Sequence, residues 1–437
     1  MKIKAAVLLV LAMLLSLVMP VSALTDIQLE SETAVLINGD TGQILYDKNM
    51  HQQMFPASIT KVMTGMLALE NAKPDEVITM SHYAVFSIGR GTSHIALDEN
   101  EEITVEQAMY ALAIESANDA ANGLAEHVSG STEEFANLMN EKAKECGALN
   151  THFVNPHGLH DEEHYTTAYD MARITMAAIK TEGFNNYFNT VRYQIPPTNK
   201  QEETRYLRTS NKLVEGLYDC EGIIMSKNGW TGEAKNTLIT AAERNGVTLI
   251  AVVMKSGATD VKFEDTAKLL NWGFDNYKPY TISGEDIAAN APASLNSGEE
   301  EGKVYLGAFD CADVTVMIPG DMSSDKITFE YTDLAVSEDN TAAVTEYTIL
   351  LDGKEIEGIE KVEIAAPLTV EKAASGVADE ITDDGGERKI SPAAIVILVV
   401  VLIIILACVL LYLRLLNIRR RNRERRMARR AERMRYR

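Results

Sequence analysis

The stretch Pro56-Ala-Ser-Ile-Thr-Lys-Val-Met-Thr64 carries most of what the sequence predicts about fold and function. A proline and a small residue before a serine mark a helix start, and apolar residues at helical spacing continue the pattern to about Glu70. Ser58 and Lys61 are three positions apart, so a helix places both side chains on one face. A serine hydroxyl becomes a nucleophile when a base takes its proton, and a lysine whose pKa is depressed can be that base. The spacing therefore predicts a nucleophile and its base.

Two further motifs follow in the chain. Ser116-Ala-Asn118 comes after an apolar stretch, at a helix end or in a loop, where a hydroxyl and an amide can face the same cleft. Lys227-Asn-Gly229 follows a predicted strand; its lysine would supply a second cation that attracts a carboxylate, and its glycine would let a peptide lie beside the strand. Taken singly, the three motifs also fit a helix cap, an Asx turn and an ordinary turn. Their joint occurrence favours one catalytic site.

The surrounding pattern predicts an α/β sandwich, an antiparallel sheet flanked by helices, over residues 24–277. A hairpin is expected at 32–47 and strands reappear late in this region, so the sheet should join its two ends. Expected helices cover 58–70, 105–127, 132–146, 167–182 and 263–277, and expected strands cover 193–195, 222–224, 237–240 and 249–253.

The next region reads as a small all-β domain at 278–370. Its first part, 278–299, is rich in Ser, Gly, Glu and Asn and is expected to be a boundary, and short strand patterns dominate from 303 to 370. Residues 371–392 are acidic and poor in large apolar side chains, as in a linker.

Both ends of the chain read as targeting segments. Residues 1–23 contain two lysines, then an apolar run, then the small residues of a cleavage site. This pattern predicts a secretory signal that is cleaved after Ala23, and an uncleaved anchor is the alternative. Residues 393–413 form an uncharged apolar stretch long enough to cross a bilayer. The tail 414–437 holds 12 Arg against two Glu, so it is expected to stay cytoplasmic and to leave the rest of the chain outside the cell membrane.

The charge balance argues against nucleic acid as a partner. The formal net charge is −22, the tail contributes +10 and the first 23 residues contribute +2, which leaves −34 on residues 24–413. Cys408 lies in the apolar stretch, which leaves three cysteines that could form disulfides: Cys146, Cys220 and Cys311. Three cysteines cannot all pair with one another, and their spacing is not that of a metal site. We expect isolated thiols and no cofactor.

The three motifs resemble those of the low-molecular-weight penicillin-binding proteins, the D-alanyl-D-alanine carboxypeptidase family of active-site serine peptidases. The similarity extends to further segments and spans roughly residues 25–370. These segments are 34–46 (AVLINGDTGQILY), 116–121 (SANDAA), 151–159 (THFVNPHGL) and 269–274 (LLNWGF). The resemblance implies the penicillin-binding and β-lactamase-like transpeptidase fold.

The resemblance also assigns roles to individual residues. Ser58 would form the acyl-enzyme, Lys61 would be the general base, and Ser116 would assist proton transfer. Backbone N–H groups of Ser58 and Trp230 would form the oxyanion hole. The residues expected to bind substrate are Asn118, Lys227, Asn228, Gly229 and Trp230.

The implied reaction removes the terminal D-alanine from a peptidoglycan pentapeptide, with β-lactam antibiotics as covalent inhibitors. One departure concerns Asn228, where the family pattern has threonine, so substrate preference or rate can differ from that of relatives. Lys262 is a further candidate for binding the substrate carboxylate. Four histidines between 152 and 164 could suggest a metal, but His157 belongs to the family-like segment, and no metal site is expected.

Two other functions remain open from the sequence. A β-lactamase-like hydrolase uses the same nucleophile, although no segment suggests its deacylating glutamate. The other alternative is a catalytically weakened wall-binding or scaffold protein. In that case, Asn228 in place of the family threonine would be the sign of the weakened catalysis. The membrane contact expected in every case is lipid around the C-terminal anchor.

Overall fold

The computed structural model describes residues 27–292, 303–306, 308–337, 341–359 and 361–371. Its first part is built on a five-stranded sheet in the order β2-β1-β9-β8-β7, in which each neighbouring pair is antiparallel. The N-terminal hairpin thus pairs with strands from much later in the chain, as expected. The strands are β1 (Thr33–Asn38), β2 (Ile44–Lys48), β7 (Ile223–Thr231), β8 (Lys235–Arg244) and β9 (Val247–Ser256).

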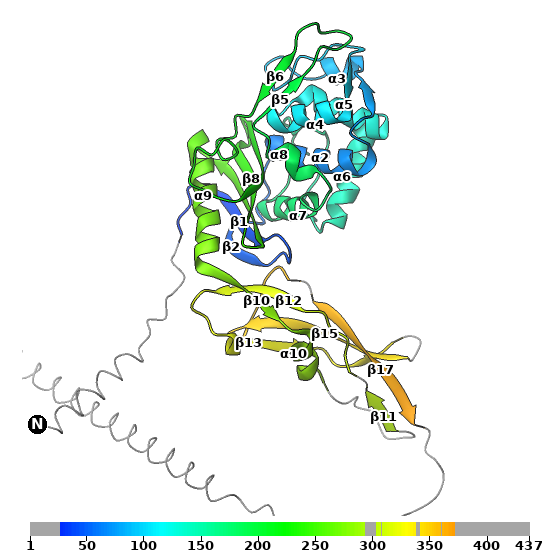
Figure 1. Ribbon diagram of the computed structural model, residues 1–437, viewed down its shortest axis with the longest axis vertical. Helices are drawn as coiled ribbons and strands as arrows, with labels where there is room; N and C mark the ends of the chain where they lie inside the picture. The colour runs from blue at the N-terminus through cyan, green and yellow to red at the C-terminus, as the bar shows by residue number, and fades with distance from the viewer. Residues whose placement is uncertain (1–26, 293–302, 307, 338–340, 360, 372–437) are drawn as a thin grey trace, which may run out of the picture. The chain divides into compact units, whose positions relative to one another are not determined.

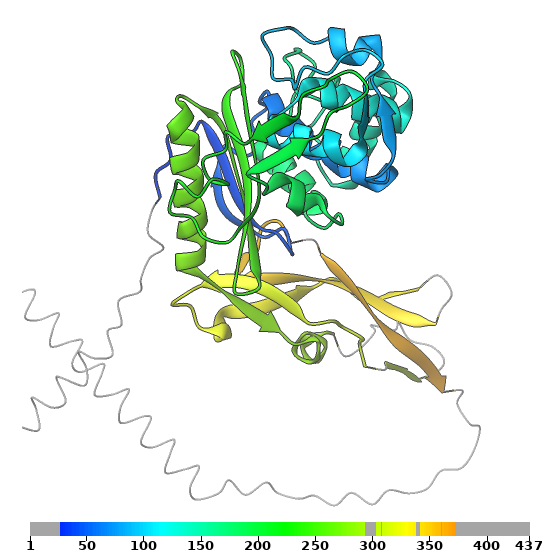
Figure 2. The ribbon, with the colours of Figure 1, turned by 45° about the horizontal axis from the view of Figure 1, so that its top comes forward.

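Helices cover both faces of this sheet (Figure 1). The long helix α9 (Thr259–Asn276) packs along one face, and the helical region lies against the other, as Figure 2 also shows. The predicted α/β sandwich is therefore present. The helices of the helical region are α2 (Lys61–Asn71), α3 (His82–Phe86), α4 (Val105–Ile114), α5 (Asn118–Ser129), α6 (Thr132–Glu145), α7 (Ala168–Ala178) and α8 (Phe184–Phe188), with the short pairs β3 (Val77–Thr79) and β4 (Glu102–Thr104), β5 (Arg192–Ile195) and β6 (Arg205–Arg208).

The central strands are apolar on both sides because both faces of the sheet are covered. In β1, Val35 and Ile37 belong to the core shared with the helical region, whereas Ala34 and Leu36 belong to the core shared with α9. Strand β9 alternates in the same way. Side chains of a strand alternate between faces, so each strand contributes to two cores at once and the sheet is fixed between its helices.

Three local expectations need correction. The predicted helix 105–127 is two helices, α4 and α5, because the chain turns at Ser116, which has a positive φ of 57°. The helix predicted from Ser58 begins as the 3-10 helix η1 (Ala57–Thr60), and α2 starts at Lys61. Lys227-Asn-Gly229 lies within β7 rather than after a strand.

The second part of the described chain is all-β apart from one short helix and one 3-10 turn, η2 (Ser324–Lys326). Strands β10 (Tyr277–Ile282) and β12 (Val314–Pro319) pair, and a separate sheet has the order β11-β17-β15-β13. Residues 278–299 are therefore not a simple boundary, since β10 and α10 (Gly284–Asn290) occupy the first part. The sheet contains β11 (Lys303–Leu306), β13 (Ile327–Tyr331), β15 (Ala342–Leu351) and β17 (Val362–Glu371), with β14 (Ala335–Val336) and β16 (Lys354–Glu355) paired to β15.

A buried glutamine joins the hairpin to the all-β part. The side-chain amide of Gln43 donates to the carbonyl oxygen of Met317 and accepts from its N–H, each at 2.7 Å. The N–H of Ile44 donates to the carbonyl oxygen of Glu357 at 2.9 Å. These bonds satisfy both ends of the Gln43 amide, so the contact does not leave a buried polar atom unpaired.

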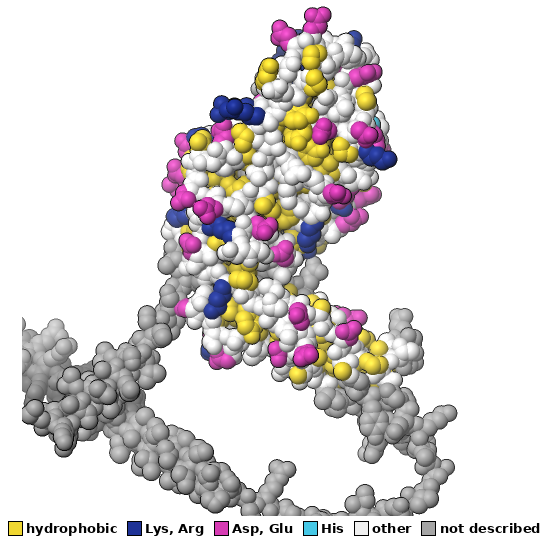
Figure 3. Space-filling model, in the orientation of Figure 1, with side chains coloured by type: hydrophobic (Ala, Val, Ile, Leu, Met, Phe, Trp, Pro, Cys, Tyr) yellow, Lys and Arg dark blue, Asp and Glu magenta, His cyan; other side chains and the backbone are white. Residues whose placement is uncertain are grey.

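The surface agrees with the acidic composition. On the face drawn in Figure 3, acidic side chains are scattered among apolar and uncharged ones, and Lys and Arg side chains are fewer. The expected signal 1–23, the linker from 372 to 392, the apolar stretch 393–413 and the tail 414–437 lie outside the described residues. Within the described residues, every helix is too short or too polar to cross a membrane.

Candidate active site

Ser58 lies in the 3-10 turn η1, immediately before α2. Ala57 has a positive φ of 52°, so the chain turns sharply after Pro56 before it enters the helix. The hydroxyl of Thr60 donates to the carbonyl oxygen of Ala57 at 2.8 Å and closes the turn. Ser58 is therefore held at the N-terminal end of a helical segment, where unpaired N–H groups favour negative charge.

A buried histidine supports this turn. Nδ1 of His164 accepts from the N–H of Val154 at 3.1 Å, which assigns the proton to Nε2, the atom that lies 2.9 Å from Thr60 Oγ1. Burial lowers the pKa of His164 to about 3, so the ring is neutral. His164 thus has a structural role. Nowhere in the described part of the chain do three or more His, Cys, Asp or Glu side chains gather where they could hold a metal ion.

Lys61 is fully buried, and its Nζ has three oxygen neighbours. Nζ lies 3.1 Å from Ser58 Oγ, 2.7 Å from Asn118 Oδ1 and 2.6 Å from the carbonyl oxygen of His157. A neutral amine has two N–H donors and one lone pair. In the uncharged form, Asn118 and His157 can accept the two protons of the amine, and its lone pair is left for the hydroxyl proton of Ser58. In the charged form the same three oxygens accept its three protons, so the contacts place Lys61 where it can exchange a proton with Ser58.

The electrostatic surroundings favour the same uncharged form. Burial is the largest cause that lowers the pKa of Lys61 well below its ordinary value, and the positive charge of Lys227 lowers it further. The carboxylate of Asp119 acts in the opposite direction but is outweighed. An amine without water and beside a second cation loses its proton more easily, so burial and Lys227 both favour the base form.

Ser116 and Asn118 lie where α4 ends and α5 begins. The N–H of Asn118, the first residue of α5, donates to the carbonyl oxygen of Ser93 at 2.9 Å. The neighbouring carboxylate of Asp119 is buried and accepts from the N–H groups of Ile95 and Leu97 at 3.1–3.3 Å. The loop of residues 93–97 therefore fixes the start of α5, and with it the amide that contacts Lys61.

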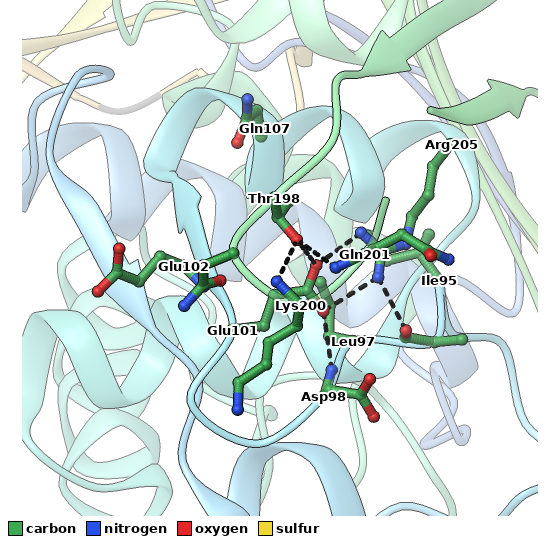
Figure 4. Close-up of polar contacts among 12 residues, drawn as sticks. Ile95, Leu97, Asp98, Glu101, Glu102, Gln107, Thr198, Lys200, Gln201 and Arg205 are labelled. Atoms are coloured by element: carbon green, nitrogen blue, oxygen red, sulfur yellow. Dashed lines mark hydrogen bonds and ion pairs between the residues drawn. The ribbon is translucent and has the colours of Figure 1, made fainter. Parts of the chain in front are cut away.

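A buried ion pair lies just after this loop (Figure 4), and its arginine, Arg205, also donates to the carbonyl oxygen of Ala96 at 3.0 Å. The guanidinium of Arg205 donates to both carboxylate oxygens of the fully buried Glu101, at 2.7 and 3.0 Å. Thr198 Oγ1 and the N–H of Asp98 donate to the same carboxylate at 2.6 and 2.9 Å. Burial alone would raise the pKa of Glu101, but the bonds from Arg205 and Thr198 outweigh it and lower that pKa.

A second buried lysine faces Ser116. Nζ of Lys227 donates to Ser116 Oγ at 2.9 Å and to the carbonyl oxygen of Asn228 at 2.8 Å. Burial and the nearby charge of Lys262 lower the pKa of Lys227 to about 7. Burial also lowers the pKa of Lys262 to about 8. Two amines with reduced affinity for protons thus lie at one end of the site, where a substrate carboxylate would restore their charge.

Strand β7 is the edge of the five-stranded sheet and runs past the nucleophile turn. A Cβ placed on Gly229 would lie 2.7 Å from the backbone nitrogen of Ser58 and 2.6 Å from Thr237 Oγ1, so a side chain does not fit. Thr237 Oγ1 in turn donates to the carbonyl oxygen of Pro56 at 2.9 Å. The residue that follows Gly229, Trp230, is 65% exposed. Glycine is therefore required for the close approach of strand and turn.

The residues predicted from the sequence form two hydrogen-bonded groups. Ser58, Lys61 and Asn118 form one group, and Ser116 and Lys227 form the other; the charge of Lys227 acts on Lys61 across the site. Sequence reasoning missed four contributions. These come from Asp119, Thr60, His164 and the carbonyl group of His157. Only Asp119 could have been suspected, as a carboxylate directly after the Ser-Ala-Asn motif.

Comparison with known proteins identifies the family of the chain. A family model described as D-alanyl-D-alanine carboxypeptidase matches residues 19–258, which is more than half of the 437 residues. The D-alanyl-D-alanine carboxypeptidase DacF of Bacillus subtilis is 38% identical over 259 residues, 58% of this chain and 64% of DacF. DacA of Haemophilus influenzae is 29% identical over 348 residues, 76% of this chain and 84% of that protein.

A solved structure extends the likeness to both described parts. The crystal structure of penicillin binding protein 5 from Haemophilus influenzae has a TM-score of 0.63 at 25% sequence identity, covering 79% of this chain and 99% of that one. The match to DacF, in contrast, spans just under two thirds of the length of that relative. The family resemblance expected from the three motifs is confirmed. The chain belongs to the D-alanyl-D-alanine carboxypeptidase family.

Proposed function

We propose that this protein is a serine-type D-alanyl-D-alanine carboxypeptidase that removes the terminal D-alanine of a peptidoglycan pentapeptide through an acyl-enzyme on Ser58. The observation that carries the proposal is the environment of Lys61. Its buried amine contacts Ser58 Oγ and two further acceptors, and its pKa is lowered well below the ordinary value. A neutral base beside a hydroxyl is what acylation of serine requires.

In the proposed acylation, Ser58 Oγ attacks the carbonyl carbon between the two D-alanines while its proton passes to Lys61 Nζ. The negative charge on the carbonyl oxygen would be stabilised by the N–H groups of Ser58 and Trp230, at on the order of 3 kcal/mol per donor. The proximity of Gly229 to the Ser58 nitrogen supports this pairing of N–H groups. Both donors belong to the backbone, so they need no reorganisation during the reaction.

The leaving D-alanine takes a proton on its amine nitrogen. We propose that this is the proton that Lys61 took from Ser58 and that it passes by way of Ser116, which the bond from Lys227 holds in place; Lys61 is then neutral again before the second step. The carboxylate of the leaving residue would bind Lys227 and Lys262, with Asn118 orienting the peptide. Water then attacks the ester carbonyl carbon, while Lys61 removes the water proton. The bond to Ser58 Oγ breaks, Ser58 Oγ takes that proton from Lys61, and the shortened peptide is released.

Asn228 is proposed to donate a hydrogen bond from its amide to the substrate carboxylate. Hydrogen bonds to charged groups contribute about 1.5–3 kcal/mol, so Asn228→Ala should lower kcat/KM for D-alanine release by roughly tenfold or more. Asn228→Thr keeps a donor and should stay within about threefold of wild type. Steady-state release of D-alanine measures both variants. An alanine variant as active as wild type would show that Asn228 does not contact the substrate.

The pH profile of kcat/KM is expected to be bell-shaped. Lys61 must be neutral, so activity falls when acid protonates it; its lowered pKa moves this acid limb to lower pH than an ordinary lysine would give. Lys227 must be charged, and because its pKa is lowered to about 7, activity falls as rising pH removes that charge. Lys227→Arg keeps the charge and should move the alkaline limb to higher pH. A profile with an unmoved alkaline limb in that variant would contradict this role of Lys227.

The test of the proposed activity is direct. The full-length protein should release free D-alanine from a pentapeptide ending in D-alanyl-D-alanine, and should release a bound penicillin slowly. Penicillin turnover of many per second would instead identify a β-lactamase. A protein that binds peptidoglycan but neither releases D-alanine nor reacts with penicillin would identify the scaffold alternative.

We also propose the division of the chain and its location. The catalytic domain would cover 24–277 and the all-β domain 278–370, both outside the cell membrane after removal of the signal 1–23. The linker 371–392, the span 393–413 and the tail 414–437 would anchor them, with the tail in the cytoplasm. Protease added to intact protoplasts should remove the catalytic domain but leave a tag placed after Arg437; loss of that tag would contradict the topology.

A further inference from the structure

Asn236 belongs to none of the three motifs, yet it lies between the sheet and one of the two buried lysines. It is the second residue of β8, where it pairs with Trp230 on β7 and with Ser256 on β9, and its side chain is buried. The pairing of β8 with β9 becomes irregular directly after it, between Asn236 and Leu238. Such irregularities redirect side chains and are frequent beside active sites.

The orientation of the Asn236 amide is fixed by its neighbours. Its Nδ2 donates to the carbonyl oxygen of Ser256 at 3.1 Å, so the donor end of the amide is occupied and Oδ1 faces the start of α9. There Oδ1 accepts from Thr259 Oγ1 and from Lys262 Nζ, each at 3.4 Å. The backbone of β9 thus aims a neutral acceptor at the amine of Lys262.

The amine of Lys262 has donors left for a ligand. Lys262 is buried and is the fourth residue of α9, where the helix dipole disfavours a cation and little water can solvate it. An ammonium group has three N–H donors, and the hydrogen bonds of the described residues give this one a single acceptor, Asn236 Oδ1. A bound carboxylate would accept the remaining donors and balance the charge.

We propose that Asn236 is a positioning residue, which holds the amine of Lys262 where the terminal carboxylate of the substrate binds. The inference rests on the proposed carboxypeptidase function, and it adds a residue that makes the enzyme selective for a peptide with a free carboxylate at its end. A neutral amide suits this task because it accepts a hydrogen bond without cancelling the charge of Lys262. A carboxylate in its place would pair with the amine and repel the substrate.

The experiment compares two pentapeptides that differ in one group. One ends in D-alanyl-D-alanine with a free carboxylate, and the other ends in the corresponding carboxamide. The full-length protein should release D-alanine from the acid with a kcat/KM at least about thirtyfold higher than that for release of D-alaninamide, since a buried cation loses its partner in the amide. Chromatography of the two released products measures both reactions.

Asn236→Ala should lower kcat/KM for the acid peptide roughly tenfold and leave that for the amide peptide unchanged. A tenfold loss is at the lower end for a hydrogen bond to a charged group, because the contact is long. In a Lys262→Met background, Asn236→Ala should cause no further loss, since Asn236 acts through the amine. Asn236→Asp keeps the shape of the side chain and should lower the acid peptide more than alanine does, so it carries the test if the alanine variant does not fold.

Asn38→Ala is the matched control. Asn38 is also a buried asparagine on a strand of the sheet, and its Oδ1 accepts from the N–H groups of Asp40 and Thr41 in the hairpin turn. Loss of these bonds should lower the melting temperature but leave the ratio of acid to amide kcat/KM as in wild type.

The outcomes separate the inference from the proposed function. If wild type releases D-alanine but Asn236→Ala slows the acid and amide peptides equally, or slows the Lys262→Met protein further, Asn236 does not act through Lys262 and the inference is refuted. Equal hydrolysis of acid and amide by wild type also refutes it, while the hydrolase stands. If wild type hydrolyses neither peptide and fluorescent penicillin does not label it, the proposed function itself fails.

Discussion

Lys61→Met is expected to reduce acylation of Ser58 at least about a thousandfold, the loss typical when an essential general base is removed. Methionine has a similar length and no proton to exchange, so Ser58 keeps its place but loses the group that takes its proton. The change also removes a buried amine, whose desolvation is costly, while it leaves the acceptors Asn118 Oδ1 and the His157 carbonyl without their donor. The rate constant for labelling by fluorescent penicillin measures acylation directly.

Two control variants make the result specific. Ser58→Ala should give no covalent label at all, because the atom that bonds to the penicillin is absent. Lys227→Met should still be labelled, but only at much higher penicillin concentration, since the carboxylate of the drug loses its cation. Thermal unfolding of each variant separates loss of chemistry from loss of fold. Labelling of a folded Lys61→Met protein at the wild-type rate would show that another group activates Ser58.

The sequence predicted the sheet and its covering helices because these depend on local pattern. Strand β9 is a continuous apolar run and α9 has helical spacing, and each is recognisable without knowledge of its partners. The break between α4 and α5 was predicted only in part: Ser116-Ala-Asn118 was expected at a helix end or in a loop, but the helical pattern 105–127 ran through it because Ala108–Asn118 contains neither glycine nor proline. Contacts of Ser116 with Lys227 and of Asn118 with Ser93 accompany the turn.

In the candidate site, too, local contacts could be predicted from the sequence and long-range contacts could not. The contact between Ser58 and Lys61 follows from a spacing of three residues in a helical segment. The other two neighbours of the Lys61 amine, Asn118 and the carbonyl oxygen of His157, come from 57 and 96 positions away. A carbonyl group carries no sequence signature, so the neutral state of Lys61 could be postulated from the motif but derived only from the fold. The requirement for glycine at position 229 is also long-range, because it arises from the close approach of the Ser58 backbone nitrogen.

Arg205→Met is expected to destabilise the protein by about 3–5 kcal/mol, the cost of leaving one member of a buried ion pair without its partner. Glu101 would remain fully buried, with Thr198 and the N–H of Asp98 as its only donors among the contacts of the described residues. Chemical denaturation of wild type and variant at pH 7 measures the loss. Arg208→Met on the same strand is the matched control; its partner Glu215 makes a more exposed pair, so the change should cost at most about 1 kcal/mol.

The pH dependence of this loss identifies its cause. In wild type the pKa of Glu101 is lowered, so its contribution to stability is present above the ordinary glutamate pKa and is lost as pH falls through the lowered one. In the variant, Arg205 no longer opposes the effect of burial on the pKa of Glu101, so Glu101 takes up a proton at higher pH. The protonated side chain is neutral, and the variant then no longer has an unpaired buried charge. The difference between the two proteins should therefore shrink at acid pH, and Glu101→Gln should recover much of the stability lost in Arg205→Met. A loss that is independent of pH and is not relieved by Glu101→Gln would mean that the guanidinium acts through packing instead.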